Sequence, residues 1–170
     1  NAYWLEDYAL FKVIKRCENY KPWTEWKEDL RNRNKSALGG FANLHKSEID
    51  DEILIQFLLD KEWKKIKNYA NENGIEIFGD MPFYVELDSA DVWSNPKDWQ
   101  LENGKPKLVA GVPPDYFNTE GQLWGYPIYN YLEMKKNNFH FWKNRIKKLG
   151  ELFDIIRIDH FLAFAKYWVI

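Results

Sequence analysis

The stretch "IIRIDHF", residues 155–161, combines the pattern of a buried strand with charged side chains. Its isoleucines have the β-branched side chains that strands favour. Arg157 lies among them, and Asp159 and His160 follow directly. A buried strand does not tolerate unpaired charge. The stretch therefore predicts a strand with a charged site at its C-terminal end.

A second strand is predicted before it in the chain. Residues 48–73 show helical spacing, with Ser47 as the expected N-cap and Gly74 just beyond the expected end. We expect this helix to bury one stripe, formed by Ile49, Ile53, Phe57, Ile66 and Tyr69. The run "IEIF", residues 75–78, then predicts a short buried strand that ends at Gly79 and Asp80.

The segment between the two strands is rich in proline, glycine and aspartate. Residues 81–130 show little periodicity and predict a long loop, a feature that is often functional. Helical spacing returns through Phe139, Trp142, Ile146 and Leu149. The order is strand, loop, helix, strand, which is a βαβ unit and implies parallel strands.

Parallel strands bring Asp80 and Asp159 to the same edge of the sheet. Neighbouring strands lie about 4.8 Å apart, so the two carboxylates are expected to converge if these strands pair. Arg157 and Asp159 are two residues apart on one strand and face the same space. A cation beside an aspartate keeps it ionised, as a glycosidic nucleophile requires.

Each of these residues also has a purely structural interpretation. Arg157 and Asp159 could form only an ion pair, Asp80 could be a turn residue, and His160 could be a structural histidine. His45 and His140 lack the spacing of metal ligands, so neither a metal site nor a cofactor is predicted.

Composition excludes several classes of protein. The 170 residues carry a formal net charge of −2, so no basic surface for nucleic acid or membrane is indicated. No apolar run approaches the roughly 20 residues of a membrane span. The single cysteine, Cys17, excludes an internal disulfide framework and suggests a reducing compartment.

Aromatic residues make up 18% of the chain and include nine tryptophans, which suits stacking on sugar rings. On their spacing, Trp4, Trp142 and Trp168 are predicted in the core. The tryptophans in loop-like stretches are predicted to contact sugars; they are Trp23, Trp26, Trp93, Trp99 and Trp124. The chain opens on a helical pattern and ends on the apolar run "KYWVI", so we expect it to be part of a longer protein.

Three long motifs resemble those of the 4-α-glucanotransferase family, also called amylomaltases or disproportionating enzymes. They are "GDMPFYVELDSADVW" at 79–93, "GVPPDYFNTEGQLWGYP" at 111–127 and "IIRIDHF" at 155–161, and "YWLEDYALF" at 3–11 also fits. The resemblance covers nearly the whole chain. It implies an α/β fold that is part of a (β/α)8 TIM barrel with a helical insertion, containing the third and fourth strands. Residues 1–60 would form the insertion and the start of a barrel helix, and residues 61–170 the partial catalytic barrel.

The resemblance implies retaining transfer of α-1,4-glucan segments between maltooligosaccharides or to glucose, in the cytoplasm and without a cofactor. It places the nucleophile at Asp159 and a neighbouring arginine at Arg157. It places Asp80 against the sugar in the −1 subsite. The remaining residues implied to bind glucan are Asp115, Tyr116, Gln122, Trp124 and His160.

The sequence departs from the family pattern at two places. Leu162 and Ala163 stand where arginine and glycine are common, and Tyr126 stands where asparagine is common. The family's acid/base glutamate falls on the strand after "IIRI", beyond Ile170, so the isolated chain is expected to be inactive.

Two other functions stay open at this stage. One is a TIM-barrel hydrolase that uses paired aspartates and a metal, for instance on phosphoesters. The other is a glucan-binding module without catalysis, in which the aromatic residues supply the binding. The sequence leaves the oligomeric state unknown.

Overall fold

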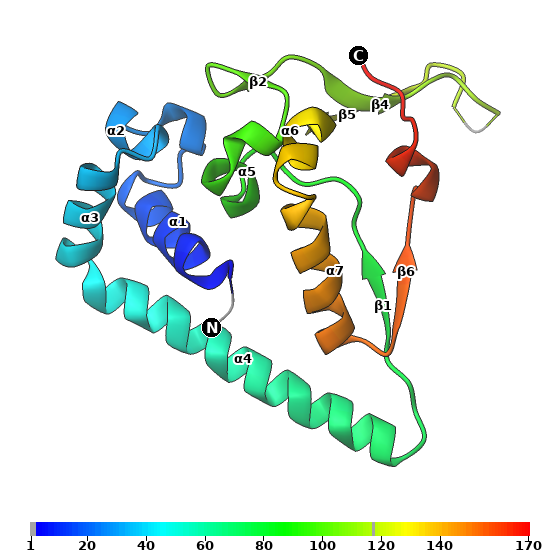
Figure 1. Cartoon of the computed structure of the whole chain (residues 1–170), viewed down its shortest axis with the longest axis horizontal. Helices are drawn as coiled ribbons and strands as arrows, with labels where there is room; N and C mark the ends of the chain where they lie inside the picture. The colour runs from blue at the N-terminus through cyan, green and yellow to red at the C-terminus, as the bar shows by residue number, and fades with distance from the viewer. Residues whose placement is uncertain (1–2, 117) are drawn as a thin grey trace.

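The computed structural model describes residues 3–116 and 118–170, so Phe117 of the second motif lies outside the described residues. It is a mixed α/β structure (Figure 1). Its helices and strands follow in this order: α1 (Leu5–Cys17), η1 (Trp23–Glu25), α2 (Glu28–Arg31), α3 (Lys35–Leu44), α4 (Lys46–Glu72), β1 (Phe78–Met81), α5 (Ala90–Ser94), η2 (Pro96–Asp98), β2 (Leu101–Glu102), β3 (Lys105–Pro106), β4 (Val109–Val112), β5 (Gln122–Pro127), α6 (Tyr131–Lys136), α7 (His140–Leu152), β6 (Ile155–Ile158) and η3 (Phe161–Phe164).

Strands β1 and β6 pair in parallel, which confirms the predicted βαβ unit (Figure 1). The register places Phe78 opposite Ile155 and Asp80 opposite Arg157. Strand β6 has the predicted position, but the prediction for the earlier strand is wrong by three residues. Strand β1 starts at Phe78, and Asp80 lies inside it instead of after it.

The side chain of Asp154 accounts for the later start of β1. Its carboxylate accepts a hydrogen bond from the backbone N–H of Ile77 at 2.8 Å, and the Ile77 carbonyl accepts one from the Asp154 N–H at 2.9 Å. Asn71 also donates to this carboxylate, at 2.9 Å. The segment before Phe78 is therefore tied to the turn that precedes β6, and regular pairing begins only beyond it.

Helix α7 connects the two strands and packs against both of them. It covers the predicted helical segment from His140 onward, with Trp142 buried, whereas Phe139 is the N-cap and lies outside the helix. Phe153 follows the helix and lies against Gly79 of β1, where a β-carbon would fall within the Phe153 ring. Glycine at this position therefore permits the close approach of the strand to the helix end.

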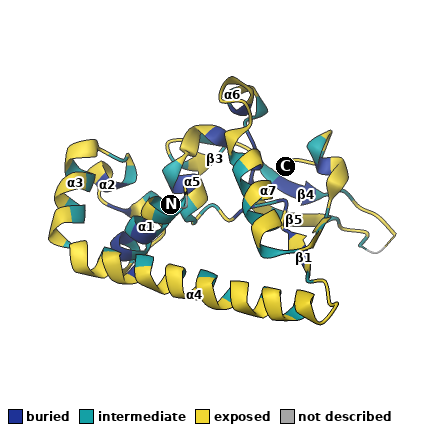
Figure 2. Cartoon of the chain, turned by 60° about the horizontal axis from the view of Figure 1, so that its bottom comes forward, coloured by how far each residue is buried: buried dark blue, intermediate teal, exposed yellow. Residues whose placement is uncertain are grey.

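Helix α4 forms as predicted, but its burial differs from the prediction. It starts at Lys46 with His45 as its N-cap, so Ser47 is not the cap, whereas Gly74 has the left-handed φ of +74° expected just past a helix end. Phe57, Ile66 and Tyr69 are exposed, and most of α4 is coloured as exposed in Figure 2. The helix contacts α1, α3 and α7 and leaves much of its surface uncovered.

Residues 81–130 are not the unstructured loop that the sequence predicts. They contain α5, η2 and two antiparallel pairs, β2 with β3 and β4 with β5. The β2–β3 hairpin turns at Asn103 and Gly104, both with positive φ, as two-residue hairpins favour. Short strands with few alternating residues give little periodic signal, which explains why the sequence pattern missed them.

The core is built mainly from aromatic residues. Trp23, Trp26, Trp93 and Trp99 are all buried, which contradicts the prediction that they contact sugars. Trp142 is buried as predicted, whereas Trp168 is exposed and was wrongly predicted in the core. One cluster joins residues from α1, such as Phe11, to residues from η3, such as Ala163. The proposed division at residue 60 stays a prediction.

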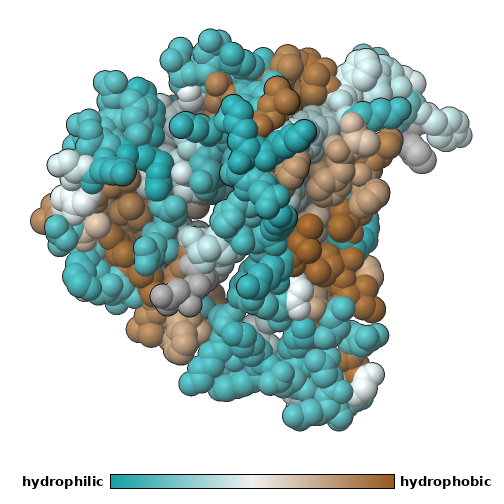
Figure 3. All heavy atoms as spheres, in the orientation of Figure 1, coloured by the Kyte–Doolittle hydropathy of each residue, from teal (hydrophilic) through white to brown (hydrophobic). Residues whose placement is uncertain are grey.

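The described residues form no closed barrel, since β1 and β6 make a sheet of two strands. Phe78 is 61% exposed and Ile155 is 42% exposed. Apolar side chains gather on the part of the surface where these strands run (Figure 3). No helix of the described residues is both long and apolar enough to cross a membrane.

The approach of Phe153 to Gly79 gives a first prediction. Gly79→Ala should destabilise the chain by about 1–3 kcal/mol, because the added methyl group forces the Phe153 ring to move within packed surroundings. The free energy of unfolding is measured by urea unfolding, with tryptophan fluorescence as the signal. Gly150→Ala in α7 is the matched control, since its β-carbon would meet nothing within 4 Å. It should stabilise the helix by about 0.5–1 kcal/mol, and equal effects of the two substitutions would contradict the packing role of Gly79.

Candidate functional site

Asp80, Arg157 and Asp159 lie together at the C-terminal ends of β1 and β6, as the sequence predicts. The register places Asp80 beside Arg157 on the neighbouring strand, and Asp159 follows β6 directly. The Arg157 Nη2 atom lies 3.1 Å from the Asp159 Oδ1, and Nη1 lies 3.9 Å from the Asp80 Oδ2. One guanidinium group therefore faces two carboxylates.

Arg157 holds Asp159 in its ionised form. Its hydrogen bond lowers the pKa of Asp159 below the ordinary value, and the backbone N–H of His160 adds to the effect. The hydrogen bond to Asp159 in turn raises the pKa of Arg157. The Asp159 side chain is 45% exposed. An ionised and accessible carboxylate can act as a nucleophile or bind a cation.

His160 turns the chain sharply after Asp159. Its φ is +51°, in the left-handed region that is uncommon for residues other than glycine and in which asparagine, aspartate and histidine are enriched. Its Nε2 lies 3.6 Å from the Asp159 Oδ2, and its ring centroid lies 5.1 Å from that of Trp124. His160 thus connects the carboxylate to an aromatic surface.

That surface, which we call the aromatic wall, consists of Tyr84, Trp124 and Tyr126. Tyr84 stacks on Tyr126 with ring centroids 5.5 Å apart and an interplanar angle of 9°. Trp124 meets Tyr84 edge to face at 5.5 Å. Burial raises the pKa of Tyr84, so its hydroxyl stays protonated near neutral pH.

The sequence interpretation identified Trp124 but missed Tyr84 and treated Tyr126 only as a departure from a pattern. A signal for Tyr126 was present, because residues 124 and 126 lie on the same face of a strand. No comparable signal existed for Tyr84, which reaches the wall through a segment that follows β1 without regular structure.

The other candidate residues lie on or near the β4–β5 hairpin. The Asp115 Oδ1 accepts a hydrogen bond from the Asn118 N–H at 2.8 Å, which shapes the turn. Tyr116 is 96% exposed. The Gln122 Oε1 accepts a bond from the Trp124 Nε1 at 2.9 Å, so Gln122 orients a ring of the aromatic wall.

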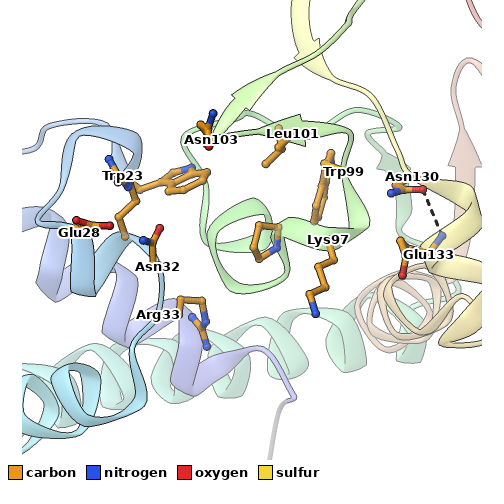
Figure 4. Close-up of a pocket in the computed structure, with 13 residues that line it drawn as sticks. Trp23, Glu28, Asn32, Arg33, Lys97, Trp99, Leu101, Asn103, Asn130 and Glu133 are labelled. Carbon is orange, nitrogen blue, oxygen red and sulfur yellow. Dashed lines mark hydrogen bonds between the residues drawn. The ribbon is translucent and has the colours of Figure 1, made fainter.

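The described residues contain no group of three or more histidine, cysteine, aspartate or glutamate side chains that could hold a metal ion. A cleft of about 930 Å³ lies elsewhere, between the α2 region and the β2–β3 hairpin (Figure 4). None of Asp80, Arg157 and Asp159 lines it. The chemistry available at the strand ends is therefore that of carboxylates, a guanidinium and an aromatic wall.

Comparison with known proteins agrees with this geometry. A family model described as 4-alpha-glucanotransferase matches residues 1–170. The chain is 46% identical over 169 residues to the 4-alpha-glucanotransferase of Aquifex aeolicus (strain VF5), covering 99% of this chain and 35% of that protein. It is 46% identical over 168 residues to "4-alpha-glucanotransferase DPE1, chloroplastic/amyloplastic" of Arabidopsis thaliana, covering 98% of this chain and 29% of that protein.

A solved structure is also similar. It is the amylomaltase from Streptococcus agalactiae in complex with acarbose, with a TM-score of 0.91 and 40% identity. The match covers 98% of this chain and 34% of that one. The chain thus spans about a third of the length of the relatives that it matches.

The contact between Arg157 and Asp159 gives a second prediction. Arg157→Gln should raise the pKa of Asp159 toward its ordinary value, measured by a pH titration of the carboxyl carbon signal in NMR. The pKa of Asp159 is lower in the folded chain than in the unfolded chain. The pair of Asp159 with Arg157 therefore stabilises the fold at pH values above the unfolded-state pKa, and this stabilisation is lost as the pH falls through the folded-state pKa. Lys105→Gln, on the β2–β3 hairpin, is the control and should leave the Asp159 titration unchanged. An unchanged Asp159 titration in Arg157→Gln would refute the assignment.

Proposed function

The chain belongs to the 4-alpha-glucanotransferase family, and we propose that it carries the nucleophile and part of the glucan-binding surface of a 4-α-glucanotransferase. The reaction proposed for the whole protein is transfer of α-1,4-glucan segments between maltooligosaccharides or to glucose. The observation that carries the proposal is the single guanidinium of Arg157 between Asp80 and Asp159 at adjacent strand ends.

The proposed fold of the whole protein is a (β/α)8 barrel, to which β1 and β6 contribute the third and fourth strands. Active sites of such barrels form at the C-terminal ends of the strands, where Asp80 and Asp159 lie. The exposed apolar residues of β1, β6 and α4 would then pack against the two thirds of the protein that this chain lacks.

In the proposed mechanism, the Asp159 carboxylate attacks the anomeric carbon of a bound glucan and forms a covalent glucosyl intermediate. The contact with Arg157 suits this role, because it keeps the carboxylate ionised at neutral pH. A retaining enzyme needs a second carboxyl group about 5–5.5 Å from the nucleophile, to protonate the leaving oxygen and then to activate the acceptor hydroxyl. The resemblance assigns that group to a later strand of the barrel.

Asp80 and the aromatic wall are proposed to hold the sugar. Asp80 shares Arg157 with Asp159 and has an exposed carboxylate that can accept hydrogen bonds from sugar hydroxyls. Tyr84, Trp124 and Tyr126 offer aromatic faces beside His160. The acarbose complex of the Streptococcus agalactiae amylomaltase supports a glucan-type ligand. Asp115, Tyr116, Gln122 and His160 remain proposed contacts.

For the isolated chain, we also propose a second activity, which is binding of glucan without turnover. The side chains of Asp159 and Arg157 are 45% and 53% exposed, so water reaches the site freely. Transfer to an acceptor sugar needs a site from which water is excluded, so this exposure favours binding without transfer. The cytoplasmic location stays a proposal, and relatives include a protein named as chloroplastic/amyloplastic.

The proposal predicts product patterns from maltotriose. The full-length protein that contains this chain should convert maltotriose to glucose and longer oligosaccharides. Asp159→Asn in that protein should lower the rate by at least about 10³-fold, as expected when a nucleophile is removed. The 170-residue chain alone should give no products, because a positioned acid contributes about 10²–10⁴-fold and the barrel around the site is incomplete. Thin-layer chromatography or mass spectrometry of the products measures all three proteins.

Asp51→Asn on the exposed surface of α4 is the matched control and should keep the activity of the full-length protein. Full activity of Asp159→Asn would show that the nucleophile is another residue. Transfer by the isolated chain would show that the acid/base lies within these 170 residues.

A further inference from the structure

Tyr84 lies just after β1, on a segment whose backbone is fixed by the core. The Arg145 Nη2 donates a hydrogen bond to the Pro82 carbonyl at 2.8 Å, and the Tyr129 hydroxyl donates one to the Phe83 carbonyl. The Phe83 side chain is 1% exposed. Burial alternates along residues 81–86, as in an extended chain, which puts the half-buried Tyr84 on the side opposite Phe83. The Tyr84 ring therefore projects from a fixed stretch of backbone.

Rings from two other parts of the chain surround the Tyr84 ring. From β5, Tyr126 stacks on it and Trp124 meets it edge to face, each with ring centroids 5.5 Å apart. From the segment after β6, the ring centroid of His160 lies at 6.3 Å and that of Tyr167 at 6.1 Å. The His160 ring thus rests against two rings, those of Tyr84 and Trp124.

The backbone at His160 has a conformation that depends on its surroundings. Its φ of +51° and ψ of +36° are left-handed, and residues other than glycine keep such angles only where neighbouring contacts hold them. The Ala163 N–H donates a hydrogen bond to the His160 carbonyl at 2.7 Å, which fixes the turn on its C-terminal side. The contacts of the His160 ring with Tyr84 and Trp124 fix its side chain.

The turn at His160 supplies a hydrogen bond to Asp159. The hydrogen bond from Arg157 lowers the pKa of Asp159 most, and the backbone N–H of His160 is the second cause. The ionisable groups that face the Asp159 carboxylate are Arg157 and the His160 ring, with Asp80 on the other side of Arg157. Tyr84 is uncharged near neutral pH, because burial raises its pKa. A movement of the turn at His160 would therefore withdraw one donor from Asp159 and leave Arg157 in place.

We propose that Tyr84 is a positioning residue, whose ring braces His160 in its left-handed turn and so keeps the His160 N–H on the Asp159 carboxylate. Tyr126 supports this brace, because it covers one face of the Tyr84 ring. The asparagine that is common in the family pattern at position 126 has no ring for this contact. The role of Asp159 as nucleophile rests on the proposed function, whereas the brace itself rests on the contacts around Tyr84 and His160.

A pH titration of the Asp159 carboxyl carbon by NMR tests the brace independently of catalysis. Tyr84→Leu should raise the pKa of Asp159, because the hydrogen bond from the His160 N–H is weakened when the turn loses its support. Tyr84→Phe retains the ring and should keep the Asp159 titration of the unsubstituted chain. An unchanged titration in a folded Tyr84→Leu chain would overturn the proposal, and so would an equal rise of the pKa in Tyr84→Phe.

Tyr126→Asn tests the same brace at its outer ring and serves if Tyr84→Leu does not fold. It should also raise the pKa of Asp159, because Tyr84 loses the ring that stacks on it. Tyr8→Leu in α1 is the matched control, since Tyr8 is likewise half-buried and makes an edge-to-face contact, with Trp4. It should leave the Asp159 titration unchanged. If Tyr126→Asn had no effect and Tyr84→Leu were unfolded, the proposal would be overturned, as it would by equal effects of Tyr126→Asn and Tyr8→Leu.

The kinetics of the full-length protein on maltotriose provide the second measurement. Tyr84→Leu should lower kcat by about tenfold, because a misplaced reacting group loses rate. The acid limb of its kcat/KM profile should move to higher pH, since that limb reports the ionisation of the nucleophile. A higher KM with unchanged kcat would mark Tyr84 as a sugar contact only and would overturn the positioning role. Full activity of Asp159→Asn, together with a raised pKa of Asp159 in Tyr84→Leu, would overturn the proposed function and support the brace.

Discussion

The parallel pairing of β1 with β6 is the constraint on which the candidate site depends. A one-residue slip of β1 would move Asp80 to the opposite face of the sheet, away from Arg157. The Asp154 carboxylate opposes such a slip, because it binds the Ile77 N–H just before pairing begins. Gly79 contributes as well, since it lets β1 lie against Phe153. The spacing of the charged groups is thus set by contacts of residues that lie one to three positions before Asp80 and three to four positions before Arg157 in the chain.

Local pattern predicted the βαβ unit, because the isoleucines of β6 and the periodicity of α7 are consistent over their whole length. It misplaced β1, because three of the four residues of "IEIF" favour strands, whereas the actual start is decided by Asp154, which is 77 residues distant from Ile77. The convergence of Asp80, Arg157 and Asp159 was predictable from topology alone. The stacking of Tyr84 on Tyr126 was not predictable in this way, because Tyr84 lies in a segment without regular structure and Tyr126 lies on strand β5 of the β4–β5 hairpin.

Burial was the least predictable property of this chain. The hydrophobic spacing of α4 predicts a covered stripe, yet Phe57 and Ile66 are exposed because the described residues leave them largely uncovered. In contrast, Trp23, Trp26, Trp93 and Trp99 lie in loop-like sequence and form the centre of the core. An indole can be buried from any backbone conformation provided that its N–H finds a partner. Trp23, Trp26 and Trp93 find backbone carbonyls as partners, and Trp99 is the exception among these four.

This chain contributes the Asp159 carboxylate to the proposed reaction, but it leaves that carboxylate exposed to water. A glycosyl intermediate passes to an acceptor sugar only if water is kept away from it. Asp159 and Arg157 are about half exposed, and the β1–β6 sheet has apolar side chains open to solvent. The same missing cover thus explains both observations. Strands that bury Phe78 and Ile155 would also close the surroundings of Asp159, so completion of the fold and exclusion of water from the proposed site are one structural event.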